Sequence, residues 1–139
     1  GFLNHFLQDT AGQFDIIVDD GSHLPSHQLL TFEHLWKSVK PDGLYIIEDI
    51  ETSWWSKNSS VYGYSLRNQT SIVEKWKGVI DSVNREFTNG KSHLTDERPD
   101  IYMNIASVEF GQNIIIFRKS LATEERFLAR RYRFRQRQR

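Results

Sequence analysis

The sequence predicts an α/β fold with parallel strands, and two observations carry this prediction. Apolar runs at residues 16–18 and 44–47 are rich in β-branched residues and flanked by turn residues, a pattern typical of strands buried on both faces of a sheet. The segment between them has room for a helix of about a dozen residues, and a helical crossover joins strands that run parallel. The chain therefore contains a β-α-β unit.

Acidic residues follow both apolar runs. Asp19 and Asp20 come directly after the first run, and Glu48 and Asp49 come directly after the second. The carboxyl ends of parallel strands meet at one edge of an open α/β sheet, which is where such sheets bind ligands. We therefore expect these four carboxylates and the imidazole of His23 to converge at that edge.

The first half of the chain has recognisable element boundaries. Residues 2–8 have the apolar spacing of the end of a helix, and Pro25 suits the start of another. The apolar face of that second helix consists of Leu29, Phe32, Trp36 and Val39. Residues 40–43, Lys-Pro-Asp-Gly, fit a type I turn leading directly into the strand at residues 44–47.

The second half predicts a loop, a helix and a β-hairpin. Residues 56–68 are polar and aperiodic, as in a loop, and a helix follows from Ser71 to near Gly90. The expected apolar face of that helix is Ile72, Trp76, Val79, Ile80, Val83 and Phe87. Residues 101–110 and 114–118 are separated by a short turn and fit two antiparallel strands.

Composition restricts the class of protein. A chain of 139 residues with 38% hydrophobic and 13% aromatic residues predicts one folded domain rather than a disordered segment. The absence of cysteine excludes disulfides, thiolate metal sites and cysteine nucleophiles, and it fits a reducing compartment, so we expect a cytoplasmic protein. We expect neither a membrane span, which needs ~18 consecutive apolar residues, nor a secretory signal.

The net charge of zero hides an uneven distribution. Residues 126–139 hold seven Arg and no acid, so the preceding residues hold eleven basic and eighteen acidic side chains. We divide the chain into residues 1–120, which form the α/β part, and residues 121–139, an Arg-rich terminal helix or tail. Such a terminus could bind nucleic acid, anionic lipid or an acidic partner. We favour a solvated end, and consider nucleic-acid binding the weaker reading, because no other motif supports it.

The residues around the acidic pairs resemble a known family. The sequence Asp-Ile-Ile-Val-Asp-Asp-Gly-Ser-His at 15–23 is followed by Lys-Pro-Asp-Gly-Leu-Tyr-Ile-Ile-Glu-Asp at 40–49 and Thr-Ser-Trp-Trp at 52–55. This combination is similar to the metal-dependent sugar O-methyltransferases of macrolide biosynthesis, the macrocin and mycinamicin type. The resemblance is close over residues 2–55 and weaker after them. The family usually has Pro-Gly-Gly at 41–43 and Thr-Ser-Tyr-Trp at 52–55.

The resemblance implies a partial Rossmann-like class I methyltransferase sheet. Its last four strands, the final two an antiparallel hairpin, would lie in residues 1–120 with flanking helices, as the carboxyl-terminal half of the domain. The glycine-rich turn and the ribose-binding acid of the family lie upstream of the first strand, and only thirteen residues precede that strand here. We therefore expect a fragment that is inactive alone and has an exposed strand edge, unless a completing chain or a homo-oligomer supplies the rest.

The resemblance also implies an activity and its residues. The intact parent would transfer the methyl group of S-adenosylmethionine to a hydroxyl of a sugar or glycoside with the help of Mg²⁺. Asp20, Glu48 and Asp49 would bind the metal, and His23 would be the base, with Asp20 assisting. Asp19 would form hydrogen bonds behind the ligands or toward the cofactor. The residues that contact S-adenosylmethionine would lie mostly upstream. Clustered carboxylates without cysteine suit a hard ion such as Mg²⁺.

Other interpretations of the same residues remain open. Asp20 or Ser22 could instead cap the helix that starts near Pro25. His23 and His27 are four residues apart, a spacing that also permits a zinc site with Asp20, which we consider the weaker reading.

The tryptophan pair and the function also have alternatives. Trp54 and Trp55 could stack on a sugar ring or could pack within a loop. The chain could be a truncated, non-catalytic methyltransferase-like interaction module that uses its Arg-rich tail, or part of a catechol-type metal-dependent O-methyltransferase.

Overall fold

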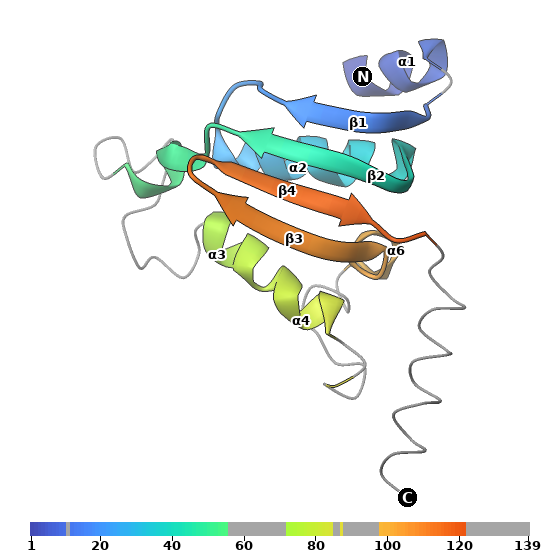
Figure 1. The fold of residues 1–139 in the computed structure, drawn as a ribbon. Coiled ribbons are helices and arrows are strands. Elements are labelled where there is room, and N and C mark those ends of the chain that lie inside the picture. The colour runs from blue at the N-terminus through green and yellow to red at the C-terminus, as the bar shows by residue number, and fades with distance from the viewer. Residues whose placement is uncertain (11, 56–71, 85–86, 88–97, 122–139) are drawn as a thin grey trace, which may run out of the picture.

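The computed structural model describes residues 1–10, 12–55, 72–84, 87 and 98–121, and it contains one four-stranded sheet of order β1-β2-β4-β3 (Figure 1). The strands are β1 (Phe14–Asp19), β2 (Val39–Glu48), β3 (Ile105–Gly111) and β4 (Ile114–Lys119). β1 and β2 are parallel, whereas β4 is antiparallel to both β2 and β3. The predicted β-α-β unit and terminal hairpin are therefore confirmed.

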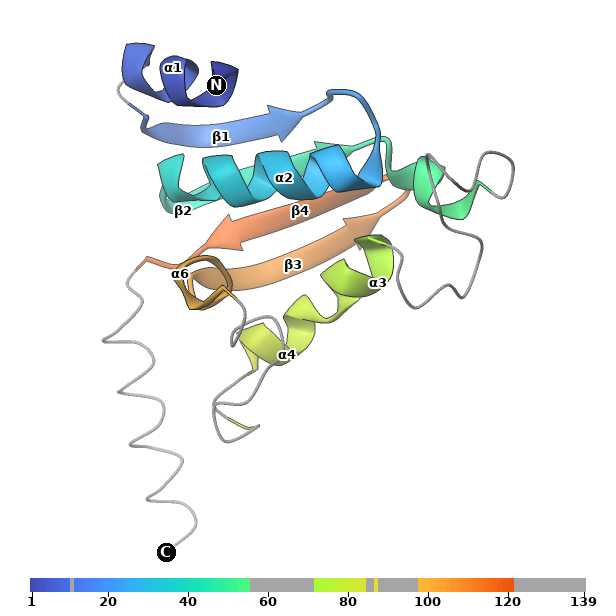
Figure 2. The same cartoon turned by 180° about the vertical axis from the view of Figure 1, so that it is seen from behind.

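Helices cover one face of this sheet. They are α1 (Phe2–Asp9), α2 (Pro25–Leu35), α3 (Ile72–Lys77), α4 (Val79–Val83) and α6 (Pro99–Tyr102), with the 3-10 turns η1 (Trp36–Ser38) and η2 (Ile50–Trp54). Figure 2 shows α2 and α6 in front of the sheet, α3 and α4 below β3, and α1 next to the outer edge of β1. None of the described helices combines the length and the apolar composition needed to cross a lipid bilayer.

Aromatic side chains fill the space between the helices and the sheet. Phe32 of α2 is fully buried, and its ring centroid lies 4.7 Å from that of Phe117 on β4, 4.9 Å from Trp76 on α3 and 5.0 Å from Tyr45 on β2. Each ring buries a large apolar area, and tilted or edge-to-face pairs add to the stabilisation. This cluster fixes α2 against β2, and the start of α2 lies close to the end of β1.

Burial of the first two strands on both faces was a wrong prediction for this structure. Ile16 is 56% exposed and Val18 is 51% exposed, whereas Tyr45 and Ile47 on β2 are fully buried. The reason is that the described helices lie on one face and that β1 is an edge strand. No described strand pairs with the outer edge of β1, so an unpaired strand edge of the kind expected lies there, beside α1.

The type I turn predicted at residues 40–43 was also wrong. The whole segment belongs to β2, whose pairing with β1 is irregular there. Asp42, the third residue of the segment, has φ +65°, which a type II turn has at that position and a type I turn does not. A Cβ on Gly43 would lie 2.7 Å from the carbonyl oxygen of Asp15, so the two strands approach too closely for any larger residue.

The second half departs from the prediction at two places. The predicted helix is divided at Gly78 into α3 and α4, and Ile80 is 59% exposed instead of lying on the buried face. Phe87, which we also placed on that face, is 59% exposed. We expected residues 101–104 to be strand, but Ile101 and Tyr102 belong to α6, which has Pro99 in its first turn, and β3 begins at Ile105. The predicted loop at 56–68, the helix end at Gly90 and residues 122–139 of the Arg-rich end lie outside the described residues.

Candidate functional site

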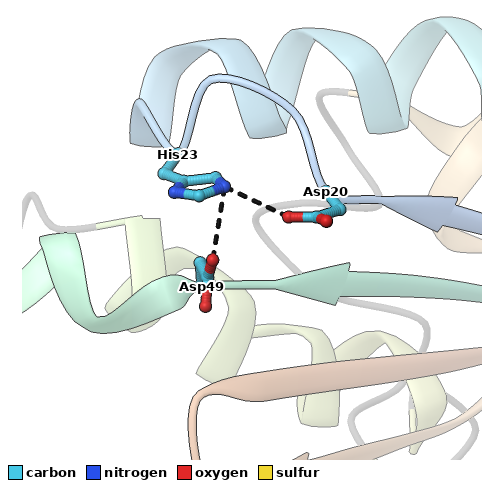
Figure 3. Close-up of side chains that lie close together, drawn as sticks. All are labelled: Asp20, His23 and Asp49. Carbon is cyan, nitrogen blue, oxygen red and sulfur yellow. Dashed lines mark hydrogen bonds and ion pairs between the residues drawn. The ribbon is translucent and has the colours of Figure 1, made fainter.

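Three predicted site residues meet at the carboxyl ends of β1 and β2. Asp20 follows β1, His23 lies in the loop before α2, and Asp49 follows β2 (Figure 3). The Nε2 atom of His23 is 3.2 Å from Oδ1 of Asp20 and 3.3 Å from Oδ2 of Asp49. One ligand-type atom from each residue lies within 4.8 Å of the other two. The imidazole therefore sits between two carboxylates that come from different strands.

The backbone is in an unusual conformation at two of these residues. His23 has φ +55° and Asp49 has φ +54° with ψ +55°, the left-handed region that non-glycine residues seldom adopt. Such conformations persist only where surrounding contacts impose them, and they cluster at functional sites. At Asp49 the left-handed turn ends β2 and directs the chain into η2.

Hydrogen bonds from buried polar side chains hold the two loops in place. Gln28 of α2, which is 2% exposed, donates from Nε2 to the backbone oxygens of Glu48 at 2.9 Å and Asp49 at 3.4 Å. Thr52 of η2 donates from Oγ1 to the backbone oxygen of His23 at 2.7 Å. The sequence analysis missed both residues, because a polar side chain on a predicted helix or loop carries no local sign of its partner.

Asn113, in the turn between β3 and β4, contacts the cluster directly. Its Nδ2 donates to Oδ1 of Asp49 at 2.6 Å, and its Oδ1 accepts from the backbone N–H of Glu51 at 2.8 Å. The sequence analysis treated this residue only as part of a hairpin turn. Its 64-residue separation from Asp49 left no local signal.

Asp19 does not join the cluster. It is only 9% exposed, and it accepts a hydrogen bond at 3.2 Å from the hydroxyl of Tyr45 on the covered face of the sheet. Burial raises the pKa of the Asp19 carboxyl, and the bonds from Tyr45 and the backbone of Gly21 oppose that rise. Burial and the neighbouring Asp19 charge likewise raise the pKa of Tyr45. Convergence of all four acids was therefore wrong for Asp19.

Glu48 lies next to Asp49 in the chain and is half-buried at the end of β2. Alternation along a strand turns its side chain to the face opposite that of Ile47, which is fully buried. Among the described residues the convergent group consists of Asp20, His23 and Asp49 and does not include Glu48. Its role as a metal ligand stays a prediction.

Two alternative interpretations can be compared with the geometry. The residue that caps α2 is Leu24, and no side chain caps the helix, so capping by Asp20 or Ser22 was wrong. His27 lies outside the convergent group, and its Nδ1 forms a 2.8 Å hydrogen bond with Oγ of Ser22. The described geometry therefore gives no support to a zinc site shared by His23 and His27.

A cavity and two exposed tryptophans lie on elements next to the site residues in the chain. The cavity, of about 290 Å³, lies between α1 and α2, and its lining includes Asp19, Gly21 and Gln28. Trp54 and Trp55, at the end of η2, are 43% and 45% exposed. Their predicted role as a sugar-stacking surface stays a prediction.

The sequence is similar to methyltransferases that act on sugar-bearing compounds. No family model matches the sequence. L-olivosyl-oleandolide 3-O-methyltransferase from Streptomyces antibioticus is 37% identical over 68% of this chain and 22% of its own length. A rhamnosyl tetracenomycin-C 2'-O-methyltransferase from Streptomyces olivaceus is 35% identical over 81% of this chain and 29% of its own length. The chain thus spans less than a third of these relatives.

A solved structure matches the fold. The MycE methyltransferase of mycinamycin biosynthesis, in complex with Mg, S-adenosylhomocysteine and mycinamycin VI, is 27% identical to this chain. The match has a TM-score of 0.68 and covers 86% of this chain and 29% of MycE. The predicted resemblance to macrolide sugar O-methyltransferases and the predicted partial class I methyltransferase sheet are therefore confirmed.

Proposed function

We propose that this chain forms the metal-binding and proton-accepting part of an S-adenosylmethionine-dependent sugar O-methyltransferase. The observation that carries the proposal is the convergence of Asp20, His23 and Asp49 at the carboxyl edge of the parallel strands. The similarity to sugar O-methyltransferases, one of them solved with Mg and a glycoside, supports the reaction class.

Asp20 and Asp49 would hold Mg²⁺, with Glu48 as a third ligand. The donor set fits, because two carboxylate oxygens from separate strands already face a common point and Mg²⁺ prefers oxygen ligands. Mg²⁺ bound here would lower the pKa of a sugar hydroxyl and orient it.

His23 would accept the hydroxyl proton on its imidazole ring. The acceptor oxygen forms a bond to the methyl carbon as the bond from that carbon to the sulfonium sulfur breaks, and the hydroxyl proton passes to the imidazole. Asp20 and Asp49 lie 3.2 Å and 3.3 Å from Nε2, so both stabilise the imidazolium that results. Thr52 fixes the backbone of His23 and so limits how far the ring can move.

The proposal also includes a strand that would pair with β1 and a cytoplasmic site of action. The unpaired edge of β1, with half-exposed Ile16 and Val18, suits a strand from a completing chain or a second copy. The cysteine-free sequence supports a cytoplasmic site of action. A non-catalytic interaction module is the second candidate, and its supporting observation is the cluster of Arg in residues 126–139.

Transfer of a labelled methyl group from S-adenosylmethionine to a glycoside tests the activity. We expect transfer by this chain, combined with the cofactor-binding part that it would need, to require Mg²⁺ and to fall by about 100-fold or more in Asp49→Ala and Asp20→Ala. Asp15→Ala is a matched control, since Asp15 lies on β1, the strand that Asp20 follows, and its side chain is 82% exposed in its pair with Lys40.

The same assay can contradict the proposal. Transfer that is equal in the native protein and both site variants would exclude these carboxylates from the reaction. If the completing part is present, an absence of transfer together with no heat on titration of S-adenosylmethionine would favour the interaction module. Faster transfer to a catechol than to a glycoside would indicate the catechol-type alternative.

A further inference from the structure

We infer that Asn113 is the positioning residue of the proposed metal site, an inference that rests on the proposed function. Asn113 lies in the β3–β4 turn, on a hairpin that follows the site residues by more than sixty positions in the chain. Its amide contacts both the carboxylate of Asp49 and the backbone of the segment that follows it. One side chain thereby connects the hairpin to the end of β2.

The two contacts of Asn113 fix the orientation of its amide. Glu51 offers a backbone N–H, which requires the amide oxygen, and Asp49 offers a carboxylate oxygen, which requires the amide N–H₂. In the reverse orientation the amide N–H₂ would face the Glu51 N–H, and the amide oxygen would face the Asp49 carboxylate oxygen. The 2.6 Å distance from Nδ2 to Asp49 Oδ1 is short, as expected for a hydrogen bond to a charged acceptor.

The two carboxylate oxygens of Asp49 have different partners. Oδ1 is held by Asn113, whereas Oδ2 faces Nε2 of His23 at 3.3 Å and is the oxygen turned toward the cluster. Without Asn113 the carboxylate could rotate about its side-chain torsions, because the described structure gives Oδ1 no other hydrogen bond. A residue that hydrogen-bonds a ligating carboxylate fixes its orientation and tunes its basicity.

Asn113 also supports the strained backbone of Asp49. The bond from Glu51 N–H to Asn113 Oδ1 anchors the first turn of η2, directly after the left-handed Asp49. Asn113 itself has φ +61°, a conformation that asparagine tolerates better than most residues. Asparagine therefore satisfies three requirements at once: a left-handed turn residue, a donor to a carboxylate and an acceptor for an N–H.

Replacement of Asn113 by glycine removes both side-chain contacts and leaves the left-handed turn unstrained. We expect Asn113→Gly to raise the Kd of the purified protein for Mn²⁺, measured by electron paramagnetic resonance, by about 10- to 100-fold. Asp42→Gly is the matched control, since Asp42 has φ +65° near the opposite end of β2, and its Kd should equal the native value. The thermal unfolding midpoint without metal, and titrations at two temperatures, separate loss of binding from loss of folding.

The outcomes distinguish this inference from the function on which it rests. Native Mn²⁺ binding that weakens in Asn113→Gly, at a temperature where both proteins are folded, supports the positioning role. Native binding that is unchanged in Asn113→Gly overturns the role and leaves the proposed function intact. An absence of Mn²⁺ binding by the native protein overturns the metal site and the role together.

Discussion

The charged side chains at the two ends of the sheet differ in the partners that they contact. At the end where β2 begins, Arg98 lies 3.1 Å from Glu33 and 3.2 Å from Asp100, and Lys37 lies 2.9 Å from Asp100. Lys119, at the end of β4, is surrounded by backbone oxygens of the same region. Every one of these cations has an oxygen partner, so this end of the sheet is electrostatically satisfied by the chain itself.

At the other end, no described lysine or arginine forms an ion pair with Asp20 or Asp49. Within the described residues, the ion pairs of Asp20 and of Asp49 are both formed with the single imidazole of His23. Carboxylates held close together in left-handed or loop backbone lower stability unless a cation joins them. The end where β2 begins therefore serves the fold, whereas the carboxyl end fits the cation site that we propose.

The largest expected effect is a loss of methyl transfer when His23, at the carboxyl end of β1 and β2, is replaced. His23→Gln keeps a polar side chain but cannot accept a proton, so kcat for methyl transfer should fall by about 10²- to 10⁴-fold. The thermal unfolding midpoint should change little. His34→Gln is the control, since His34 lies on α2 and its ring Nδ1 is 2.9 Å from the backbone oxygen of Leu30 in the same helix, away from the described site residues. A kcat equal to that of the native protein would break the assignment of function to the carboxyl end.

A core substitution should act on the fold alone. Phe32→Ala removes the ring that contacts Trp76, Tyr45 and Phe117, and the free energy of unfolding in urea should fall by about 3–5 kcal/mol. Phe2→Ala, at a residue that is 80% exposed, should leave it nearly unchanged. Equal stability of Phe32→Ala and the native protein would contradict the packing described.

Lys119 tests the satisfied end of the sheet. Its Nζ donates to the backbone oxygens of Trp36 at 3.0 Å, Lys37 at 3.2 Å and Val39 at 2.6 Å. Lys119→Met leaves these oxygens without that donor, and we expect urea denaturation to show a loss of about 1–3 kcal/mol with Mg²⁺ affinity unchanged. Lys40→Met breaks an exposed pair and should matter less. A larger loss in Lys40→Met than in Lys119→Met would reverse this assignment.

The smallest effect is a pH dependence at the same end. Hydrogen bonds from Arg98 and Lys37 lower the pKa of Asp100 from 3.8 to about 2. Because the folded-state pKa is lowered, the stabilisation is fully present above pH 3.8 and is lost as the pH falls toward about 2. The thermal midpoint of Asp100→Asn should therefore lie slightly below that of the native protein at neutral pH and converge with it in acid. A constant difference across that range would contradict the shift.

Local sequence patterns predicted the elements and the approximate place of the site. Apolar runs followed by acids located β1, β2 and the edge that carries Asp20, His23 and Asp49, because strand ends and turn residues are local properties. The same patterns failed where distant contacts decide. Ile80 lies outside the buried face because Gly78 divides the helix and the core is reached by Trp76 and Val79 instead.

Long-range hydrogen bonds could not be predicted from one sequence. Asp19 and Asp20 are adjacent acids, yet Asp19 is bound by Tyr45, 26 positions away, and only Asp20 reaches His23. Asn113 stands in a turn where glycine or aspartate would fit the same local pattern, and its contact with Asp49 becomes visible only when β4 pairs with β2. Element type depends on neighbours in the chain, whereas the orientation of a site depends on neighbours in space.

Calorimetric titration with Mg²⁺ is the most direct test of the proposal that Asp20 and Asp49 bind a metal ion. We expect the native protein and Asp15→Ala to bind Mg²⁺ with the same Kd. We expect the Kd of Asp20→Ala and of Asp49→Ala to be about tenfold higher or more. Equal binding by all four proteins, or binding that is lost in Asp15→Ala instead, would contradict the proposal.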